Sequence, residues 1–492
     1  MLAPEIKQKL ASIVGADDVS EDEAALSAYR SGGAVEGGKP LLLVRPSSTA
    51  EVRSLVRLAR EEGLNLVLSS SAPPRLRGDS VPEGEGIVVD MSGMDRIVRL
   101  GRRNKVALIE PGVTFERLIP AADAAGLKVL MPLRPKAGKS VLASALEREP
   151  ILIPKYHWDM TDPMLCTELI FGTGDLFRTG SAAGPGSLEQ QWAAGGAQKN
   201  PMGPAQTDFV RVVQGAQGTM AAVTWCTLKL EVKPSIHRIW FVPEAKLSRL
   251  SEFTYRSLRP KLADEWLILN AYALAALTCG EAGEAVDELA ERQAPWTLIY
   301  GVSGYEYLPE ERVAYQERDL ARHAQAAGVV PVPEVPGCSW RRMEAILSSP
   351  SPEPYYKTGP RGDFLDLFFL TTLDRVPAFT EVMREEAERF SYPPERLGAY
   401  IQPIQQGRNV HVEFTLYFRP AERERALELF SSASAALASA GAFFSRPYGP
   451  WASLAYARCP DTVAALRKVK GILDPDHVLN RGKLCFKMEE VG

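Results

Sequence analysis

The feature that most constrains the fold is a change of hydrophobic pattern at Pro234. Before this proline, short apolar runs alternate with turns and with two clear helices. After it, longer apolar runs alternate with long amphipathic helices. A chain of 492 residues exceeds one ordinary hydrophobic core, so the change of pattern predicts two or three domains.

The first clear unit of the N-terminal half is a strand, a helix and a second strand. LLLVRP (residues 41–46) is typical of a strand, and LNLVLS (64–69) predicts the next one. The residues between them have the apolar spacing of a helix, which Ser48 or Thr49 can cap and Gly63 can end. Further along we expect strands at 86–100 and 105–112, a helix at 114–126, a hairpin around Gly174 and a strand at 220–232.

The C-terminal half alternates long strands and helices, which predicts the α+β fold class and a sheet domain built from two similar halves. The expected strands are 236–243, 266–274, 296–307, 364–373 and 409–418. The expected helices are 246–258, 311–328, 378–390 and 421–441, with a final helix near 461–472.

Composition and charge argue against several classes of protein. The net charge of -4 argues against nucleic-acid binding, and no apolar run is long enough to span a membrane. The N-terminal segment is amphipathic and lacks a signal-peptide core. Six cysteines without a CxxC pair, and five histidines without HExxH, predict a reduced, cytoplasmic protein with no iron–sulfur cluster or metal site of its own.

The stretch LVLSSSAPPRLRGDSVP, residues 66–82, follows the second strand as a phosphate-binding loop would, but it lacks the usual glycines. Glycine lets backbone amides turn toward an anion, whereas Pro73 and Pro74 have no amide hydrogen to donate. Arg75 and Arg77 can instead bind phosphate oxygens bidentately. The stretch is therefore either a phosphate site rebuilt with side chains or a solvated basic loop.

LDPDHVLNRGK (473–483), close to the C-terminus, resembles the end of the vanillyl-alcohol-oxidase-type, or PCMH-type, FAD enzymes. The segments 45–68, 87–98, 105–118, 161–180 and 214–234 are similar to further stretches of that family, in the same order. The resemblance covers nearly the whole chain. It implies a two-subdomain PCMH-type FAD-binding domain (1–235), an α+β substrate-binding cap with an antiparallel sheet (236–444) and a return of 445–492 to the FAD domain.

The resemblance also implies that FAD lies extended between two small subdomains, with two loops around its pyrophosphate and isoalloxazine ring. These loops depart most from the family pattern. The first loop lacks its glycine run, and the second, 132–150, has Val141 to Ser144 where paired glycines are usual. No histidine stands in the first loop, so we expect non-covalent FAD. The expected cofactor-binding residues are Ser70, Ser71, Arg75, Arg77, Gly78, Asp79, Ser80, Pro111, Gly112, Lys139, Ser140, Gly218, Asn480 and Lys483.

The class of substrate is narrowed by family motifs that this sequence lacks. Family members that oxidise 2-hydroxy acids use a metal-binding set of histidine and acidic residues, of which only His411 and Glu413 remain here, on one face of a strand. SRPYGPW (445–451) is more similar to the Tyr–Arg segment of the phenol-oxidising branch, in which arginine and tyrosine stabilise a phenolate, although Ser445 stands at the tyrosine position. The expected catalytic residues are Arg446, Tyr448, His411, Glu413 and Tyr400.

Two functions follow from this resemblance. The first is an FAD-dependent oxidoreductase that transfers a hydride from a small organic substrate, phenolic or hydroxylated, to the flavin. The second is a flavin-poor or flavin-free scaffold subunit of a larger redox complex. Because the chain has no cluster motif, turnover would need oxygen, a quinone or an electron-transfer or iron–sulfur partner subunit. Substrate identity and oligomeric state stay open.

Overall fold

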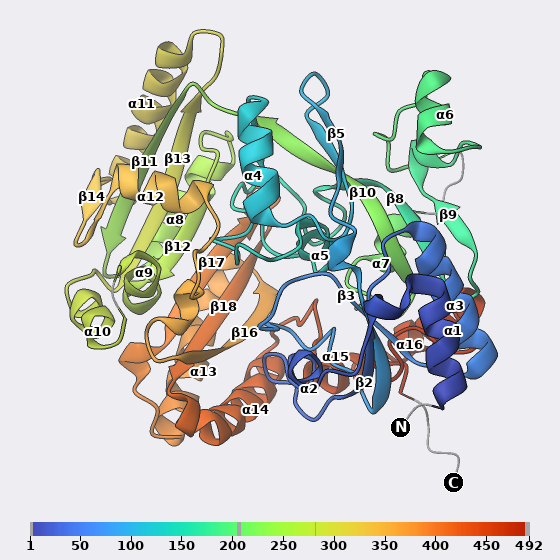
Figure 1. The fold of residues 1–492 in the computed structure, drawn as a ribbon. Helices are drawn as coiled ribbons and strands as arrows, with labels where there is room; N and C mark the ends of the chain where they lie inside the picture. Colours follow the sequence, from blue (N-terminus) through green and yellow to red (C-terminus); the bar gives the residue numbers. More distant parts are fainter. Residues whose placement is uncertain (1–2, 204–207, 281, 488–492) are drawn as a thin grey trace.

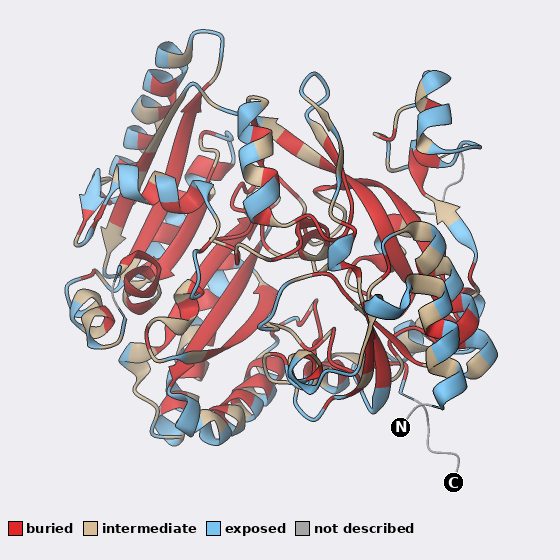
Figure 2. Ribbon diagram, in the orientation of Figure 1, coloured by how far each residue is buried: buried red, intermediate tan, exposed pale blue. Residues whose placement is uncertain are grey.

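The computed structural model describes residues 3–203, 208–280 and 282–487 as two lobes that meet along one side (Figure 1). One lobe contains two sheets from the N-terminal half together with the C-terminal segment. The other lobe is built on one large sheet from the C-terminal half. Figure 2 shows that buried residues are concentrated in the sheets, while the outer faces of the helices are exposed. No described helix is both long enough and apolar enough to cross a membrane.

The first sheet contains the predicted strand–helix–strand unit. Its strands, in the order β1–β2–β4–β3, are β1 (Val19–Ser20), β2 (Lys39–Val44), β4 (Glu85–Asp90) and β3 (Leu66–Ser69). Helix α3 (Thr49–Glu62) connects β2 to β3. The Ser48 hydroxyl accepts a hydrogen bond from the Glu51 amide, and Gly63 ends the helix with a φ of 67°. The predicted unit is therefore confirmed.

The second sheet is antiparallel and lies beside the first (Figure 1). Its strands are β5 (Ile97–Gly101), β6 (Val106–Ile109), β10 (Ala221–Val232), β8 (Met164–Phe171) and β9 (Leu176–Arg178), with β7 (Leu127–Val129) paired to β10. The hairpin around Gly174 is confirmed, as is helix α4 (Phe115–Ala124). The single strand expected at 86–100 is wrong. The Asp90 carboxylate accepts a hydrogen bond from the Ser92 amide in a tight turn, and β5 then joins the other sheet.

The second lobe, called the cap lobe below, is built on the large sheet. This sheet is antiparallel throughout, as the fold class predicts. In spatial order its strands are β11 (Ile236–Glu244), β13 (Trp296–Gly304), β12 (Trp266–Asn270), β17 (Gly398–Ile404), β18 (Asn409–Phe418) and β16 (Asp363–Thr371). The strand expected over 266–274 is too long, because Asn270 caps a helix at this point. The Asn270 side chain accepts a hydrogen bond from the Ala273 amide, and α9 (Ala271–Thr278) begins.

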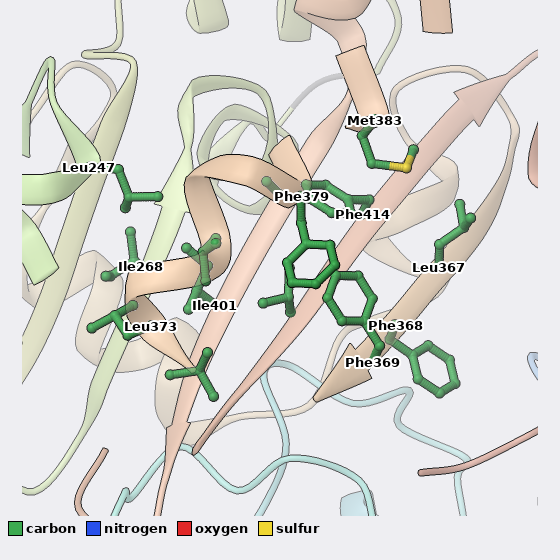
Figure 3. Packing of buried hydrophobic residues seen from close by; sticks show 14 of the residues in the cluster. Leu247, Ile268, Leu367, Phe368, Phe369, Leu373, Phe379, Met383, Ile401 and Phe414 are labelled. Atoms are coloured by element: carbon green, nitrogen blue, oxygen red, sulfur yellow. The ribbon is translucent and has the colours of Figure 1, made fainter. Parts of the chain in front are cut away.

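Helices cover both faces of the cap sheet. On one face lie α8 (Leu247–Leu258), α11 (Pro309–Ala327), α13 (Val376–Arg389) and α14 (Arg423–Ser439), which confirms the long helices predicted there. Figure 3 shows Phe379 and Met383 of α13 packed over Phe369 and Phe414 of the sheet. The other face packs against α9, α12 (Trp340–Ser348) and Leu152 of the first lobe. This face therefore forms part of the junction between the lobes.

The remaining described elements are short or terminal. They are α1 (Pro4–Val14), α2 (Glu23–Ser27), α5 (Val141–Leu146), α6 (Leu188–Ala193), α7 (Phe209–Val213), α10 (Glu284–Glu291), β14 (Glu334–Val335), β15 (Cys338–Ser339), α15 (Trp451–Tyr456) and α16 (Pro460–Leu473). After α16 the chain returns to the first sheet. The Leu66 amide donates to the Val478 carbonyl at 2.7 Å, and the Asn480 amide donates to the Leu66 carbonyl at 2.8 Å. These bonds place the C-terminal segment beside β3.

Candidate functional site

The two predicted cofactor loops face each other across a hollow of about 110 Å³ in the first lobe. The Ala72 amide of the first loop donates to the Gly138 carbonyl of the second loop at 2.9 Å. The Ser140 amide donates to the Ser71 hydroxyl at 3.1 Å. Gly215 and Gly218 close a third side of the hollow, both with positive φ. The structure therefore brings together loops that lie some 60 residues apart.

The second loop forms a short helix where the family pattern has paired glycines. Ser140 caps this helix, α5, by accepting a hydrogen bond from the Ala143 amide at 3.0 Å, and its own hydroxyl donates to the Pro111 carbonyl at 2.5 Å. Val141 and Leu142 pack into the core of the second sheet. The sequence analysis missed α5, whose only local signal is a capping serine before an apolar run.

The positive side chains that line this hollow already contact protein groups. The Arg75 guanidinium lies 4.3 Å from the centre of the Tyr29 ring and donates to the Ser71 carbonyl. Lys136 Nζ donates to the carbonyls of Ala72 and Pro74 at 3.1 and 2.9 Å. These two cations therefore fix the conformation of the first loop.

Two further predicted cations form ion pairs. Arg77 Nη1 lies 3.4 Å from an Asp366 carboxylate oxygen of the cap. Lys139 Nζ lies 2.7 Å from Glu147 Oε2 and 3.0 Å from Glu149 Oε1. The charge of each is thus matched by an acid of the same chain.

Two carboxyl groups, those of Asp79 and Glu147, line the same hollow. Burial raises the pKa of Glu147 to about 7 against the opposing charge of Lys139, and the charges of Asp79 and Glu149 add to the rise. Burial works against ionisation of Glu149 as well, but Lys139 and Arg77 hold its pKa below the ordinary value. Glu147 and Glu149 therefore differ in protonation near neutral pH.

This difference predicts opposite effects of two matched substitutions on stability. Since the pKa of Glu147 is higher in the folded than in the unfolded chain, the folded state binds the extra proton. The free energy of unfolding then falls as pH rises from about 4.5 to about 7. We expect Glu147→Gln to raise the melting temperature at about pH 8 and to change it little at about pH 5. Glu149→Gln should lower it at about pH 8, and equal losses from both variants would contradict the assignment.

The other predicted cofactor residues surround the first loop. A Cβ on Gly112 would lie 2.1 Å from the Ser92 carbonyl oxygen, and one on Gly78 would lie 2.2 Å from Val35, so both glycines allow close packing. The Asn480 side chain donates to the carbonyls of Asp79 and Gln217 at 2.7 and 2.6 Å. Buried Lys483 Nζ lies 3.7 Å from Glu83 Oε1, with no shorter hydrogen bond among the described residues.

A second, larger hollow of about 610 Å³ lies at the junction of the two lobes. It shares Pro74 to Arg77 and Tyr448 with the smaller hollow, so the first loop and Tyr448 separate the two. Aromatic side chains of the cap and of the C-terminal segment line it: Phe364, Phe368, Phe430 and Trp451. Charged side chains, among them Arg77, Asp366 and Arg423, line it as well, so the lining suits a small ligand with an aromatic ring and a polar group.

The five predicted catalytic residues lie close to one another beside the larger hollow, but of the five only Tyr448 is among the residues that line it. Arg446 Nη2 lies 3.3 Å from His411 Nδ1, and its guanidinium lies 4.2 Å from the centre of the Phe368 ring. His411 Nε2 lies 3.8 Å from Glu413 Oε2, and the Tyr400 ring lies 5.7 Å from the His411 ring. Tyr448 lies 6.2 Å from the same Phe368, ring centre to ring centre.

Arg446 is the one member of this set whose charge is not matched. It is 3% exposed, its Nη1 has no hydrogen-bond partner, and no acidic side chain forms an ion pair with it within the part of the chain that the structure describes. Burial lowers its pKa, and burial together with Arg446 lowers the pKa of His411 to about 4, so His411 is neutral near neutral pH. A buried guanidinium without a carboxylate favours an anionic ligand group.

Lys357 is a residue that the sequence analysis did not include in the site. Its Nζ lies 2.8 Å from Asp366 Oδ1 and 2.6 Å from Glu413 Oε1. Burial opposes ionisation of Glu413, but Lys357 holds its pKa well below the ordinary value. With Arg77, this cluster contains two positive and two negative groups and is balanced. Lys357 follows two tyrosines and precedes a glycine-rich turn, and this pattern does not predict that it pairs with two buried acids.

The residues of the two hollows fit FAD, which has both phosphate groups and a flat, largely apolar ring. The Ser69 hydroxyl lines the smaller hollow, is buried and has no hydrogen-bond partner among the described residues. Ser70, Ser71 and Ser80 add hydroxyl donors along the same wall. Leu68, Leu142 and Val223 supply apolar surface beside them. Together the hollows reach the size typical of ligand sites, roughly 300–1,000 Å³.

Two family models match the chain: an FAD binding domain over residues 40–145, and the C-terminal domain of FAD linked oxidases over residues 372–484. Curated relatives include the glycolate oxidase subunit GlcD of Bacillus subtilis, 23% identical over 48% of this chain and 46% of the relative. The 4-cresol dehydrogenase flavoprotein subunit of Pseudomonas putida is 25% identical over 37% of this chain and 35% of the relative. The matches therefore span less than half the length of these relatives.

Solved structures match over almost the whole chain. p-Cresol methylhydroxylase (PCMH) with substrate bound has a TM-score of 0.81 and 17% identity, covering 98% of this chain and 96% of that one. The 4-ethylphenol oxidase of Gulosibacter chungangensis has a TM-score of 0.81 and 18% identity, covering 99% and 98%. At these identities the likeness shows the fold. It confirms the predicted fold class, and the two family models bear out the predicted resemblance to FAD-linked oxidases and the expected FAD cofactor.

Proposed function

We propose that the protein is an FAD-dependent oxidoreductase that takes a hydride from a small phenolic substrate bound in the larger hollow. Bound FAD would supply the hydride acceptor. The observation that carries the proposal is the buried guanidinium of Arg446, which lacks an acidic partner among the described residues and lies against Phe368, a wall of this hollow. A phenolate oxygen beside Arg446 would provide the missing negative charge.

The neighbouring side chains have complementary roles in this proposal. His411 accepts a hydrogen bond from Arg446 at Nδ1, so neutral His411 carries its proton on Nε2 and holds the guanidinium in place. Tyr448 lines both hollows, and burial raises its pKa well above the ordinary value, so it is a neutral donor beside the substrate. Lys357 keeps Glu413 ionised next to His411.

The lining of the hollow favours a phenolic substrate over a 2-hydroxy acid. Phe368, Phe430 and Trp451 offer aromatic surface for a ring. Within the described ranges, no group of three histidine, cysteine or acidic side chains is placed to hold a metal ion. Two solved structures with the same fold are p-cresol methylhydroxylase and 4-ethylphenol oxidase, which supports the phenolic class.

The relative from Pseudomonas putida is named as a flavoprotein subunit, which supports the proposal that this chain also works with a partner subunit. The cytoplasmic location predicted from the cysteine pattern stays a prediction.

A flavin-free scaffold subunit is the second candidate, and one observation favours it. The cations expected to bind the cofactor phosphates are already engaged: Arg77 with Asp366, and Lys139 with Glu147 and Glu149. Asp79 and Glu147 also bring carboxyl groups to the smaller hollow, where they would repel a pyrophosphate once ionised.

The visible spectrum of protein purified with FAD supplied distinguishes these candidates. We expect a yellow protein that releases FAD on denaturation, and whose flavin absorbance is lost anaerobically on adding 4-ethylphenol or 4-cresol. Arg75→Ala with Arg77→Ala should retain less FAD, because both side chains line both hollows. A colourless protein without a thermal shift on adding FAD would establish the scaffold function. Loss of absorbance with glycolate or D-lactate only would overturn the phenolic class.

A further inference from the structure

We propose that the cap carries a second ligand site, remote from the larger hollow, that binds a small aromatic carboxylate. The site is a hollow of about 130 Å³ where the segment after α13, the end of β18 and the start of α14 meet. A cavity of roughly 150 Å³ is large enough to hold benzene, so this hollow can take a ligand of ring size. The inference does not depend on the proposed function.

Positive charge exceeds negative charge around this hollow. Four arginines and one acid line it: Arg361, Arg396, Arg419, Arg425 and Glu422. Arg361 and Arg396 share a single carboxylate, that of Asp287, and Arg396 Nη2 lies 3.4 Å from it. The Glu422 carboxylate accepts a hydrogen bond from the Arg419 amide at 2.8 Å. No described acid forms an ion pair with the Arg419 or Arg425 side chain. An anion would restore the balance.

Two of the arginines are held in place beside the hollow. The Arg361 side chain is 8% exposed, and its Nε is buried without a hydrogen-bond partner among the described residues. Arg425 Nε donates to the Phe390 carbonyl at 3.0 Å, which fixes the plane of its guanidinium at the rim. Guanidinium groups fixed in this way match the two oxygens of a carboxylate.

The floor of the hollow is apolar and explains why the ligand should carry a ring. Phe418 is 3% exposed, and Leu429 and Ala426 of α14 lie beside it. Phe390 adds a further aromatic wall. An aromatic carboxylate would place its ring on this floor and its charge among the arginines, whereas inorganic phosphate could use the rim alone.

Calorimetric titration of the full chain with benzoate tests the site. We expect one benzoate to bind, and inorganic phosphate to bind at least about tenfold more weakly. Arg419→Gln with Arg425→Gln should weaken benzoate binding by at least about tenfold, and both residues are exposed, so the variant should fold. Arg408→Gln is the control. Arg408 is exposed and lies outside the hollow, so its replacement removes the charge of one exposed arginine without changing the site.

Three outcomes would overturn the proposal. The first is an absence of benzoate binding. The second is binding that the Arg419→Gln, Arg425→Gln variant leaves unchanged, which would place benzoate elsewhere, for example beside Arg446. The third is phosphate binding as tight as benzoate binding, which would show that the apolar floor takes no part.

Discussion

Replacement of Arg446 by methionine should lower turnover by about 10²–10³-fold without lowering the melting temperature. In the proposed function this guanidinium stabilises negative charge on the substrate, and a preorganised buried charge is typically worth that much in rate. Its burial without an acidic partner among the described residues also costs stability in the free protein. An apolar side chain of similar length removes this cost, so the melting temperature should stay equal or rise. Single-turnover reduction of the bound flavin measures the first effect, and thermal unfolding the second.

The matched control is Arg375→Met. Arg375 also lies over a phenylalanine of the cap, with its guanidinium 5.2 Å from the centre of the Phe379 ring, but it is exposed, and Phe379 does not line the larger hollow whereas the Phe368 beside Arg446 does. Its replacement should leave turnover unchanged. Arg446→Lys should recover only part of the activity, because lysine keeps the charge but loses the planar fork. Full activity of Arg446→Met would show that Arg446 plays no part in the reaction.

Replacement of Lys470 by methionine should lower the free energy of unfolding by about 3–5 kcal/mol, a typical loss when one partner of a buried ion pair is removed. Lys470 and Asp474 are 1% and 0% exposed and form an ion pair within α16 and its C-cap. Lys470 Nζ also donates to the carbonyls of Thr219 and Leu479, at 2.5 and 3.1 Å. The variant therefore leaves the buried Asp474 carboxylate without its cation, although the amides of Val478 and Leu479 still donate to it, and it removes the lysine donor from two carbonyls.

Urea unfolding followed by fluorescence, with the midpoint shift converted through a common slope, measures this loss. Arg384→Met is the control, because Arg384 and Glu388 form an exposed pair one turn apart on α13. Such a pair contributes only about 0.3–0.5 kcal/mol. A loss below about 1 kcal/mol for Lys470→Met would contradict the central role assigned to this lysine.

Much of the fold was predictable because hydrophobic periodicity and helix-end residues are local signals. The unit around α3 was found from apolar spacing and from the capping residues Ser48 and Gly63. The helices α13 and α14 were found in the same way. The strand predicted at 86–100 failed because its two halves are equally apolar, and only the pairing of each half assigns it to a different sheet.

The candidate site was less predictable because its chemistry depends on pairs that are distant in sequence. The sequence around Arg77 predicts a phosphate-binding residue. The structure instead pairs it with Asp366, nearly 290 positions away. The sequence around Lys357 predicts a loop residue, whereas the structure places its amino group between Asp366 and Glu413. The resemblance at the C-terminus suggested Arg446 as a candidate, but no local pattern shows that its charge is unmatched.

The return of the C-terminal segment has a consequence for biosynthesis. Leu66, at the start of the strand that leads into the first loop, is hydrogen-bonded to Val478 and Asn480, and the Asn480 side chain holds the Asp79 carbonyl of that loop. Synthesis proceeds from the N-terminus, so these bonds cannot form until residues 478–480 have left the ribosome. Until then one edge of β3 lacks its partner, and an unpaired edge is open to association with other chains. The cofactor cradle is therefore completed only after this segment has been made, and a nascent chain that lacks it must be protected without it.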